Sequence, residues 1–229
     1  MANLMVTSET NTEFVQILPS IIADAENRIY RELDLLATIT RDTSSHLNSN
    51  IRNFTLPSTL GRFVGLNGIN VITPAGATVS NGTRSPLTPN SLNFIDFTWP
   101  STTAPASDTV PVYFAMVTDQ QVVVGPSPGQ DFNVEVIGWI RPDPLSSTNT
   151  TTYLSLYLQD LLISASMIYA SGFMRNFGSQ ADDAQMATSW QGQYEKHFMS
   201  ANIEEQRKRW AAGGWTSQSP NPIATPPRQ

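Results

Sequence analysis

Residues 111–145 constrain the fold most strongly, because they contain three short runs of strand-forming residues separated by turn residues. The first two runs, 112–117 and 121–124, are rich in β-branched and aromatic side chains. The third, 133–140, alternates between apolar and polar positions. Prolines and glycines between the runs cannot occupy the middle of a sheet without disrupting it. This spacing predicts a three-stranded antiparallel meander.

The segment before this region has the apolar period of a helix. Between residues 14 and 33 apolar side chains recur at i, i+3, i+4 and i+7. Thr10 and Glu13 form a capping-box pattern directly before it. Pro19 lies inside the pattern and predicts a kink or a restart of the helix close to it.

Two further helices are predicted after the strand region. Apolar residues repeat at helical spacing from residue 152 to Phe177, where Gly178 ends the pattern. Ser179 is placed to cap a last helix that extends to about residue 210. The inner face of this helix includes His197, which is expected to pack there and not to bind a metal.

These patterns predict an α+β fold: a small helical bundle with an inserted antiparallel β-sandwich or partial barrel. The N-terminal helix and the two long C-terminal helices make up the bundle. Residues 10–36 and 152–210 are expected to form the helical domain, and residues 52–145 the inserted β domain. Residues 211–229, which contain two glycines and four prolines, are expected to form an extended C-terminal arm.

The remaining segments are rich in hydroxyl and amide side chains. Residues 35–56 are expected to be mostly loop with one short strand or helical turn, and His46 within them a surface residue. Residues 54–56, 61–68 and 69–73 are expected to form the first strands. Residues 94–99 are expected to form a short strand between two polar loops, 74–93 and 100–109. Long polar loops on a compact sheet are typical of binding surfaces.

Composition argues against the common enzymatic and metal-binding chemistries. The 229 residues include no cysteine, two histidines and two lysines, and no Walker, dinucleotide, nucleophile-elbow or calcium-loop motif. We therefore expect no catalytic residue, no metal site and no cofactor. A pair of catalytic carboxylates contributed by distant residues stays open, because sequence spacing does not reveal such pairs.

The charge balance also narrows the range of partners. The formal net charge is −6 and the sequence pI is about 4.8, whereas a protein that grips DNA through its phosphates is usually basic. The longest apolar-rich run, 153–169, is interrupted by polar residues, so no signal peptide and no membrane span are expected.

The order of short motifs in residues 111–145 resembles the middle of the head-to-tail adaptor proteins of tailed bacteriophages. That order is Pro-x-Tyr, a short turn, an apolar strand, Pro-x-Pro-Gly, an alternating strand and Arg-Pro-x-Pro-Leu. An opening helix like residues 18–34 is also typical of these proteins, so the resemblance in layout covers nearly the whole chain.

The resemblance implies a structural protein of the virion, made in the host cytoplasm and located at the head–tail junction. It implies a homo-oligomeric ring, usually of twelve copies, that docks on the portal protein. A tail or nozzle protein would bind the far side of the ring. DNA would pass through the ring during ejection without specific binding, which agrees with the acidic net charge.

Charged residues of the first helix are expected to contact the neighbouring copy. Arg28, Arg31 and Glu32 are the candidates, because arginine–carboxylate pairs between subunits fix their register. The alternative is that these residues form an ordinary solvated helix face.

The arm supplies a second set of candidate contacts. In the family that the chain resembles, the C-terminal segment often reaches into the portal. The portal-binding candidates are Trp215, Pro220, Pro222, Ile223, Pro226 and Pro227. Prolines favour extended backbone before contact, and a single large aromatic side chain can supply much of the burial in a small interface. The alternative is a frayed terminus without a role.

A function of a different class also fits part of the sequence. A β-sandwich module that binds carbohydrate or a cell surface, in a virion or secreted protein, would explain the loops rich in threonine and asparagine. It would leave the two C-terminal helices and the proline-rich tail without a role.

Overall fold

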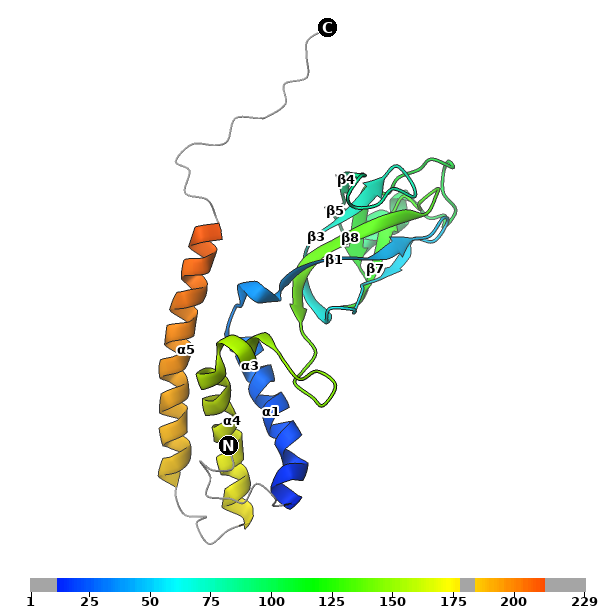
Figure 1. Cartoon of the computed structure of the whole chain (residues 1–229). Coiled ribbons are helices and arrows are strands. Elements are labelled where there is room, and N and C mark those ends of the chain that lie inside the picture. Colours follow the sequence, from blue (N-terminus) through cyan, green and yellow to red (C-terminus); the bar gives the residue numbers. More distant parts are fainter. Residues whose placement is uncertain (1–11, 178–183, 213–229) are drawn as a thin grey trace. The chain divides into compact units, whose positions relative to one another are not determined.

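The computed structural model describes residues 12–177 and 184–212, except for the side chains of residues 172–187 and 212 (Figure 1). The chain forms two compact units, Met1–Leu36 together with Tyr153–Gln229, and Ala37–Thr152. The first unit is helical and the second is built from strands. The predicted α+β fold class is therefore confirmed.

The helical unit consists of α1 (Thr12–Glu32), α3 (Tyr153–Tyr157), α4 (Gln159–Phe177) and α5 (Ala184–Ala212). Helix α4 lies between α1 and α5 and packs against both (Figure 1). The core of the helical unit contains Ala25, Ile29, Leu33, Leu35, Leu154, Leu158, Leu161, Leu162, Ala165, Tyr194 and Ala201. Burying each large aliphatic side chain stabilises such a unit by roughly 1.5–3 kcal/mol.

Helix α1 runs through Pro19 as one element, so the predicted restart of the helix is wrong. Proline removes one intrahelical hydrogen bond. Phe14 before it and Ile21 after it are nevertheless buried in one cluster with Met167 and Ala170 of α4. Packing on both sides of the proline holds the helix together where local propensity alone predicts an interruption.

The β unit is a sandwich of two four-stranded sheets. Sheet A has the order β1-β8-β3-β4 and is made of β1 (Ile39–Leu47), β8 (Phe132–Arg141), β3 (Arg62–Thr73) and β4 (Thr83–Pro86). Sheet B has the order β2-β7-β6-β5 and is made of β2 (Asn53–Thr55), β7 (Gln121–Gly125), β6 (Tyr113–Met116) and β5 (Thr88–Pro89). All strand pairs are antiparallel except β5–β6.

The core of the sandwich is filled by both sheets. Strand β8 contributes Phe132, Val134 and Val136, and strand β7 contributes Val122 and Val124. These residues alternate with outward-facing ones, as expected for strands buried on one face. The alternation recognised in the sequence therefore marks the core face of β8.

The predicted meander is wrong in its last pairing. Strands β6 and β7 form a hairpin, but β8 leaves that sheet and pairs with β1 and β3 of sheet A. Consecutive strands are neighbours in only about two-thirds of cases, and a sandwich requires crossings between its sheets. Strand signals identify a strand but not its partner.

The strands predicted between residues 54 and 73 correspond to β2 and β3. The prediction that residues 35–56 are mostly loop is wrong, because they also contain a 3₁₀ turn (Leu36–Thr38) and the nine-residue strand β1. Strand β1 is polar because it is an edge strand with an irregular register between Asp42 and Ser45. The polar segment 74–93 likewise contains β4, β5 and the start of α2 (Leu92–Thr98).

The predicted strand at residues 94–99 is also wrong, because this segment forms helix α2. Ser91 caps the helix, and its side chain accepts a hydrogen bond from the Phe94 backbone amide. Ile95 is buried against Ala115 and Val123 of sheet B. Aromatic and β-branched residues favour strands, but here one-sided packing on a sheet outweighs propensity.

Among the described residues, none of the helices combines the length and the apolar character that a membrane span needs.

Candidate interaction surfaces

Arg28 and Glu32 of α1 form a cluster with Tyr194 of α5. Arg28 Nε lies 2.9 Å from Glu32 Oε1, and the guanidinium carbon lies 4.2 Å from the centre of the Tyr194 ring. The Tyr194 hydroxyl donates a 2.6 Å hydrogen bond to Glu32 Oε2. Burial, followed by this bond, raises the pKa of Tyr194. The cluster ties α1 to α5 within one copy.

Arg31, the third residue predicted at a subunit interface, is exposed. It has no ion-pair partner among the described residues, unlike Arg28 and Glu32. Of the three candidates, Arg31 is therefore the one whose charge is free to contact another molecule.

A buried carboxylate ties the end of α5 to two other segments of the helical unit. Glu205 accepts hydrogen bonds from the Leu36 amide at 2.8 Å and from Lys208 Nζ at 2.7 Å. The Tyr153 hydroxyl lies 3.4 Å from the same carboxylate. Hydrogen bonds to Glu204, Glu205 and Tyr153 raise the pKa of Lys208. The i,i+4 spacing of Glu204 and Lys208 predicts their ion pair, but the contacts with Leu36 and Tyr153 join distant segments that no spacing in the sequence predicts.

The two histidines lie in different settings. His197 is half-buried between α4 and α5, with Nδ1 3.0 Å from Asp160 Oδ2. His46 is exposed on β1. In the described part of the chain, no group of three or more histidine, aspartate or glutamate side chains could hold a metal ion.

Helix α5 carries apolar side chains on two opposite sides. Ala201 is buried in the bundle, whereas Met199, Ile203 and Trp210 are 65%, 51% and 66% exposed. At about 100° per residue, the three exposed side chains lie within about 40° of one another, on the side opposite Ala201. We call these three residues the outer α5 surface.

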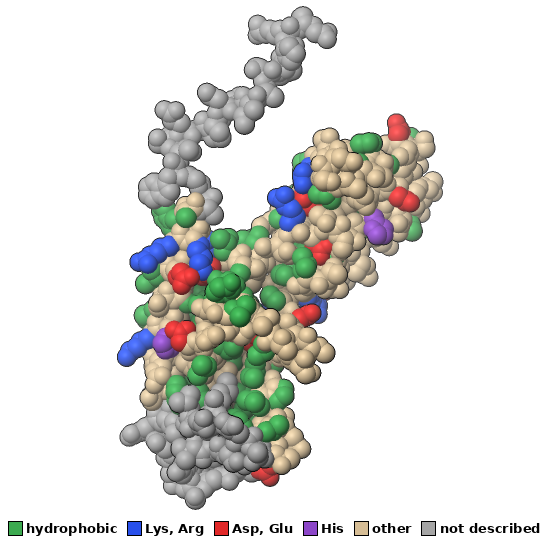
Figure 2. Space-filling model, viewed as in Figure 1, with side chains coloured by type: hydrophobic (Ala, Val, Ile, Leu, Met, Phe, Trp, Pro, Cys, Tyr) green, Lys and Arg blue, Asp and Glu red, His purple; other side chains and the backbone are tan. Residues whose placement is uncertain are grey.

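A second exposed apolar surface lies on α3 and the start of α4. Leu156, Tyr157 and Ile163 are exposed there, and we call them the α3–α4 surface. Leu156 and Ile163 are seven residues apart, and backbone bonds from Leu158 and Leu162 continue the helical turn across the junction, so they share one face. In Figure 2, hydrophobic and acidic side chains lie close together on the helical unit.

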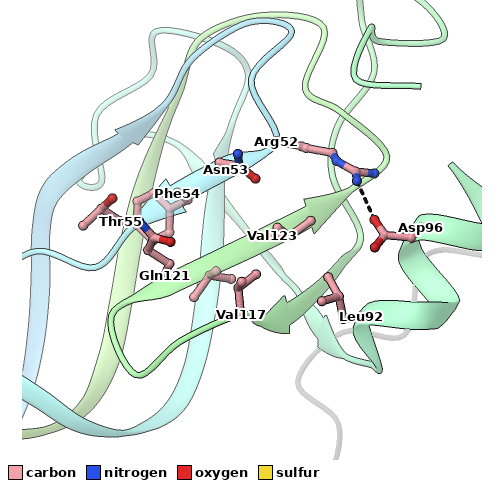
Figure 3. A pocket seen from close by; sticks show the side chains of 10 residues that line it. Arg52, Asn53, Phe54, Thr55, Leu92, Asp96, Val117, Gln121 and Val123 are labelled. Carbon is pink, nitrogen blue, oxygen red and sulfur yellow. Dashed lines mark hydrogen bonds and ion pairs between the residues drawn. The ribbon is translucent and has the colours of Figure 1, made fainter. Parts of the chain in front are cut away.

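The β unit has a groove on the outer face of sheet B, beside α2 (Figure 3). Its volume is about 280 Å³, and it is lined by Arg52, Asn53, Phe54, Thr55, Leu92, Asp96, Val117, Gln121, Val122 and Val123. Arg52 pairs with Asp96 and donates a 2.8 Å bond to the Trp99 carbonyl. Phe97 on the same helix is 89% exposed. An aromatic ring this exposed is a candidate contact for another protein.

A second ion-pair cluster lies on the outer face of sheet A around Glu135 of β8. The Glu135 side chain is fully buried, with Arg84 Nε at 3.0 Å, Asn70 Nδ2 at 2.8 Å and Arg41 Nη1 at 3.5 Å. Burial alone would raise the pKa of Glu135, but the bonds from Arg84 and Asn70 and the charge of Arg41 outweigh it and lower the pKa. The four residues come from the four strands of the sheet, so the cluster holds the sheet in register.

The predicted portal-binding residues lie outside the described residues. These are Trp215, Pro220, Pro222, Ile223, Pro226 and Pro227. Helix α5 ends at Ala212, slightly later than the predicted end near residue 210.

Comparison with known proteins gives one family match. The family model described as SU10 adaptor protein matches residues 3–220, which include the whole β unit and most of the helical unit. No curated protein matches the chain.

Proposed function

We propose, from the premise that this chain belongs to the SU10 adaptor protein family of bacteriophage head-to-tail adaptors, that its copies form a ring docked on the portal protein. The chain is a structural adaptor protein of the virion, and the proposal adds its place, the head–tail junction, and its mode of assembly. The ring would join the capsid to the tail. The observation that carries this proposal is the family match over residues 3–220.

The division of the chain into two units supports a role between different partners. Each unit has its own buried core, so one unit can hold neighbouring copies while the other contacts a different protein. Exposed Phe97 beside the sheet B groove is the best candidate in the β unit for contact with a tail or nozzle protein. The residues beyond Ala212 remain the proposed portal-binding arm.

Charge supports a DNA path without specific binding. The formal net charge is −6. Several arginines of the β unit are engaged by carboxylates: Arg52 is matched by Asp96 and Arg62 by Asp119, while Arg41 and Arg84 share the single carboxylate of Glu135. Cations matched in this way have less affinity to offer a phosphate backbone. DNA would then pass without being gripped.

Portal binding is the test of the proposal. The full-length chain is mixed with purified portal rings, and the mass of the complex is measured by size-exclusion chromatography with light scattering. We expect a complex that contains many copies of the chain per portal, with twelve copies on a twelvefold portal. Class averages from electron microscopy should show an added ring on one side of the portal. Separate elution of the two proteins would contradict the proposal.

The family assignment favours the adaptor over a carbohydrate-binding module, because the match spans the helical unit as well as the β-sandwich. A glycan-binding sandwich would give the helical unit no role.

A further inference from the structure

The outer α5 surface is exposed within one copy, whereas a helix with apolar residues on opposite sides is usually buried on both. Met199, Ile203 and Trp210 extend along about 16 Å of helix at about 1.5 Å per residue. Their side chains are more than half exposed within one copy. Scattered apolar residues are normal on protein surfaces, but aligned large ones mark contact sites.

The same helical unit exposes a second and different apolar surface, the α3–α4 surface. A ring is built from a contact in which one surface of a copy meets another surface of the next copy. A twofold dimer would instead need one surface that matches itself. Two separate apolar surfaces on one unit therefore fit the geometry of a ring.

We propose that the outer α5 surface of one copy packs on the α3–α4 surface of the next copy. This inference rests on the ring proposed above, and it names the surfaces that build it. Trp210 and Met199 would cover Leu156 and Ile163 of the neighbour, with Tyr157 beside them.

Charge around the two surfaces is complementary. Lys196 and Arg207 are exposed on one flank of the outer α5 surface, and neither has an ion-pair partner in the described part of the chain. Asp160, which lies between Tyr157 and Ile163 in the chain, is exposed beside the α3–α4 surface. Glu204 of α5 is also exposed and pairs with Lys208, which donates to the Tyr153 hydroxyl of α3. Glu204 shares the Lys208 ammonium with Glu205, so two carboxylates face one cation. Free cations on one surface and excess acid on the other favour their pairing and fix the direction of the contact.

The α3–α4 surface and the outer α5 surface lie on different sides of α5. The rings of Tyr157 and Tyr153 are in tilted contact, with centres 5.0 Å apart, and the Tyr153 hydroxyl accepts a bond from Lys208 on the inner side of α5. The outer α5 surface lies on the opposite side of the same helix. Within one copy the two surfaces therefore do not cover one another.

Cysteine cross-linking tests the inference, because the chain has no cysteine of its own. Variants Ile203→Cys and Leu156→Cys are assembled on portal rings and treated with a short bis-maleimide. A mixture of the two single variants should give cross-linked dimers, and neither variant alone should. The double variant should give a ladder of covalent multimers. Gln193→Cys, also exposed on α5 but about 80° around the helix from Ile203, is the matched control and should give no dimer with Leu156→Cys.

Several outcomes would overturn the inference. Dimers from Ile203→Cys alone would show that α5 packs against itself. Assembled rings without cross-links between the two positions would place the contact elsewhere, while the proposed function would survive. If the unmodified chain forms no ring on the portal, the proposed function and this inference both fail.

A substitution gives an independent measurement. Ile203→Asp should reduce ring assembly on the order of tenfold, since buried anchors dominate such contacts. The monomer should keep its circular dichroism and thermal unfolding, because Ile203 is exposed in it. Gln193→Asp should assemble normally. Equal assembly of both variants would refute the role of the outer α5 surface.

Discussion

Replacing Glu135 by glutamine removes a fully buried negative charge from sheet A with little change in side-chain size. Glutamine can still accept the bond from Asn70, but its amide turns a donor toward Arg84 or Arg41. The charge-assisted bonds are lost in the variant. Hydrogen bonds to charged groups contribute about 1.5–3 kcal/mol each. Because the ends of both arginines are partly exposed and screened by water, we expect the E135Q variant to lose about 1–2 kcal/mol of unfolding free energy.

The pH dependence gives this prediction a second check. The pKa of Glu135 is lowered in the folded protein relative to its ordinary value of 4.5. A carboxylate with a lowered folded pKa stabilises the fold above the unfolded pKa, and this contribution is lost as pH falls through the folded pKa. The stability difference between the native chain and E135Q should therefore be constant above about pH 5.5 and should shrink as the pH falls below 4.5.

The assay must resolve the β unit, because two compact units can unfold separately. Hydrogen exchange measured by mass spectrometry on peptides from β3 and β8, over a urea series, provides that resolution. The matched control is Asp119→Asn, which removes a carboxylate from an exposed pair with Arg62. Exposed pairs contribute little, so the control should unfold like the native chain. E135Q stability equal to that of the control, or a difference that persists unchanged below pH 4.5, would refute the reasoning.

Further predictions concern the helical unit and the arm. Tyr194→Phe removes the 2.6 Å bond to Glu32 and should destabilise the helical unit by about 1 kcal/mol in urea unfolding; an unchanged midpoint would mean that the cluster is not stabilising. Arg31→Glu should weaken ring assembly in light scattering without changing the thermal unfolding temperature, because its side chain is exposed; full assembly would assign Arg31 to solvent. Arg28→Glu should weaken ring assembly and also lower the thermal unfolding temperature, since Arg28 also packs on Tyr194; weaker assembly with an unchanged unfolding temperature would contradict this. Truncation after Ala212 keeps α5 complete and should weaken portal binding in a pull-down experiment, whereas full binding would mean that Trp215 and the following residues are dispensable.

Periodicity in the sequence was sufficient to identify most of the secondary structure. The helical repeat of apolar residues predicted α1 and the two long C-terminal helices, and β-branched runs predicted β6, β7 and β8. These signals are local, because they depend on which side of one element faces a core. The α+β class and the resemblance to phage adaptors followed from the order of these elements along the chain.

The tertiary structure decided what depends on residues far apart in the chain. Strand β8 joins sheet A and not the neighbouring hairpin, and α2 forms where propensity favours a strand, because Ile95 is buried against sheet B. The tertiary structure also decides which candidate contact residues are already engaged within one copy. Arg28 and Glu32 are held by Tyr194, a residue 162 positions from Glu32, and the Glu135 cluster brings together one side chain from each of four strands. The free energy of such pairings comes from contacts between distant segments, and no local pattern encodes which segments meet.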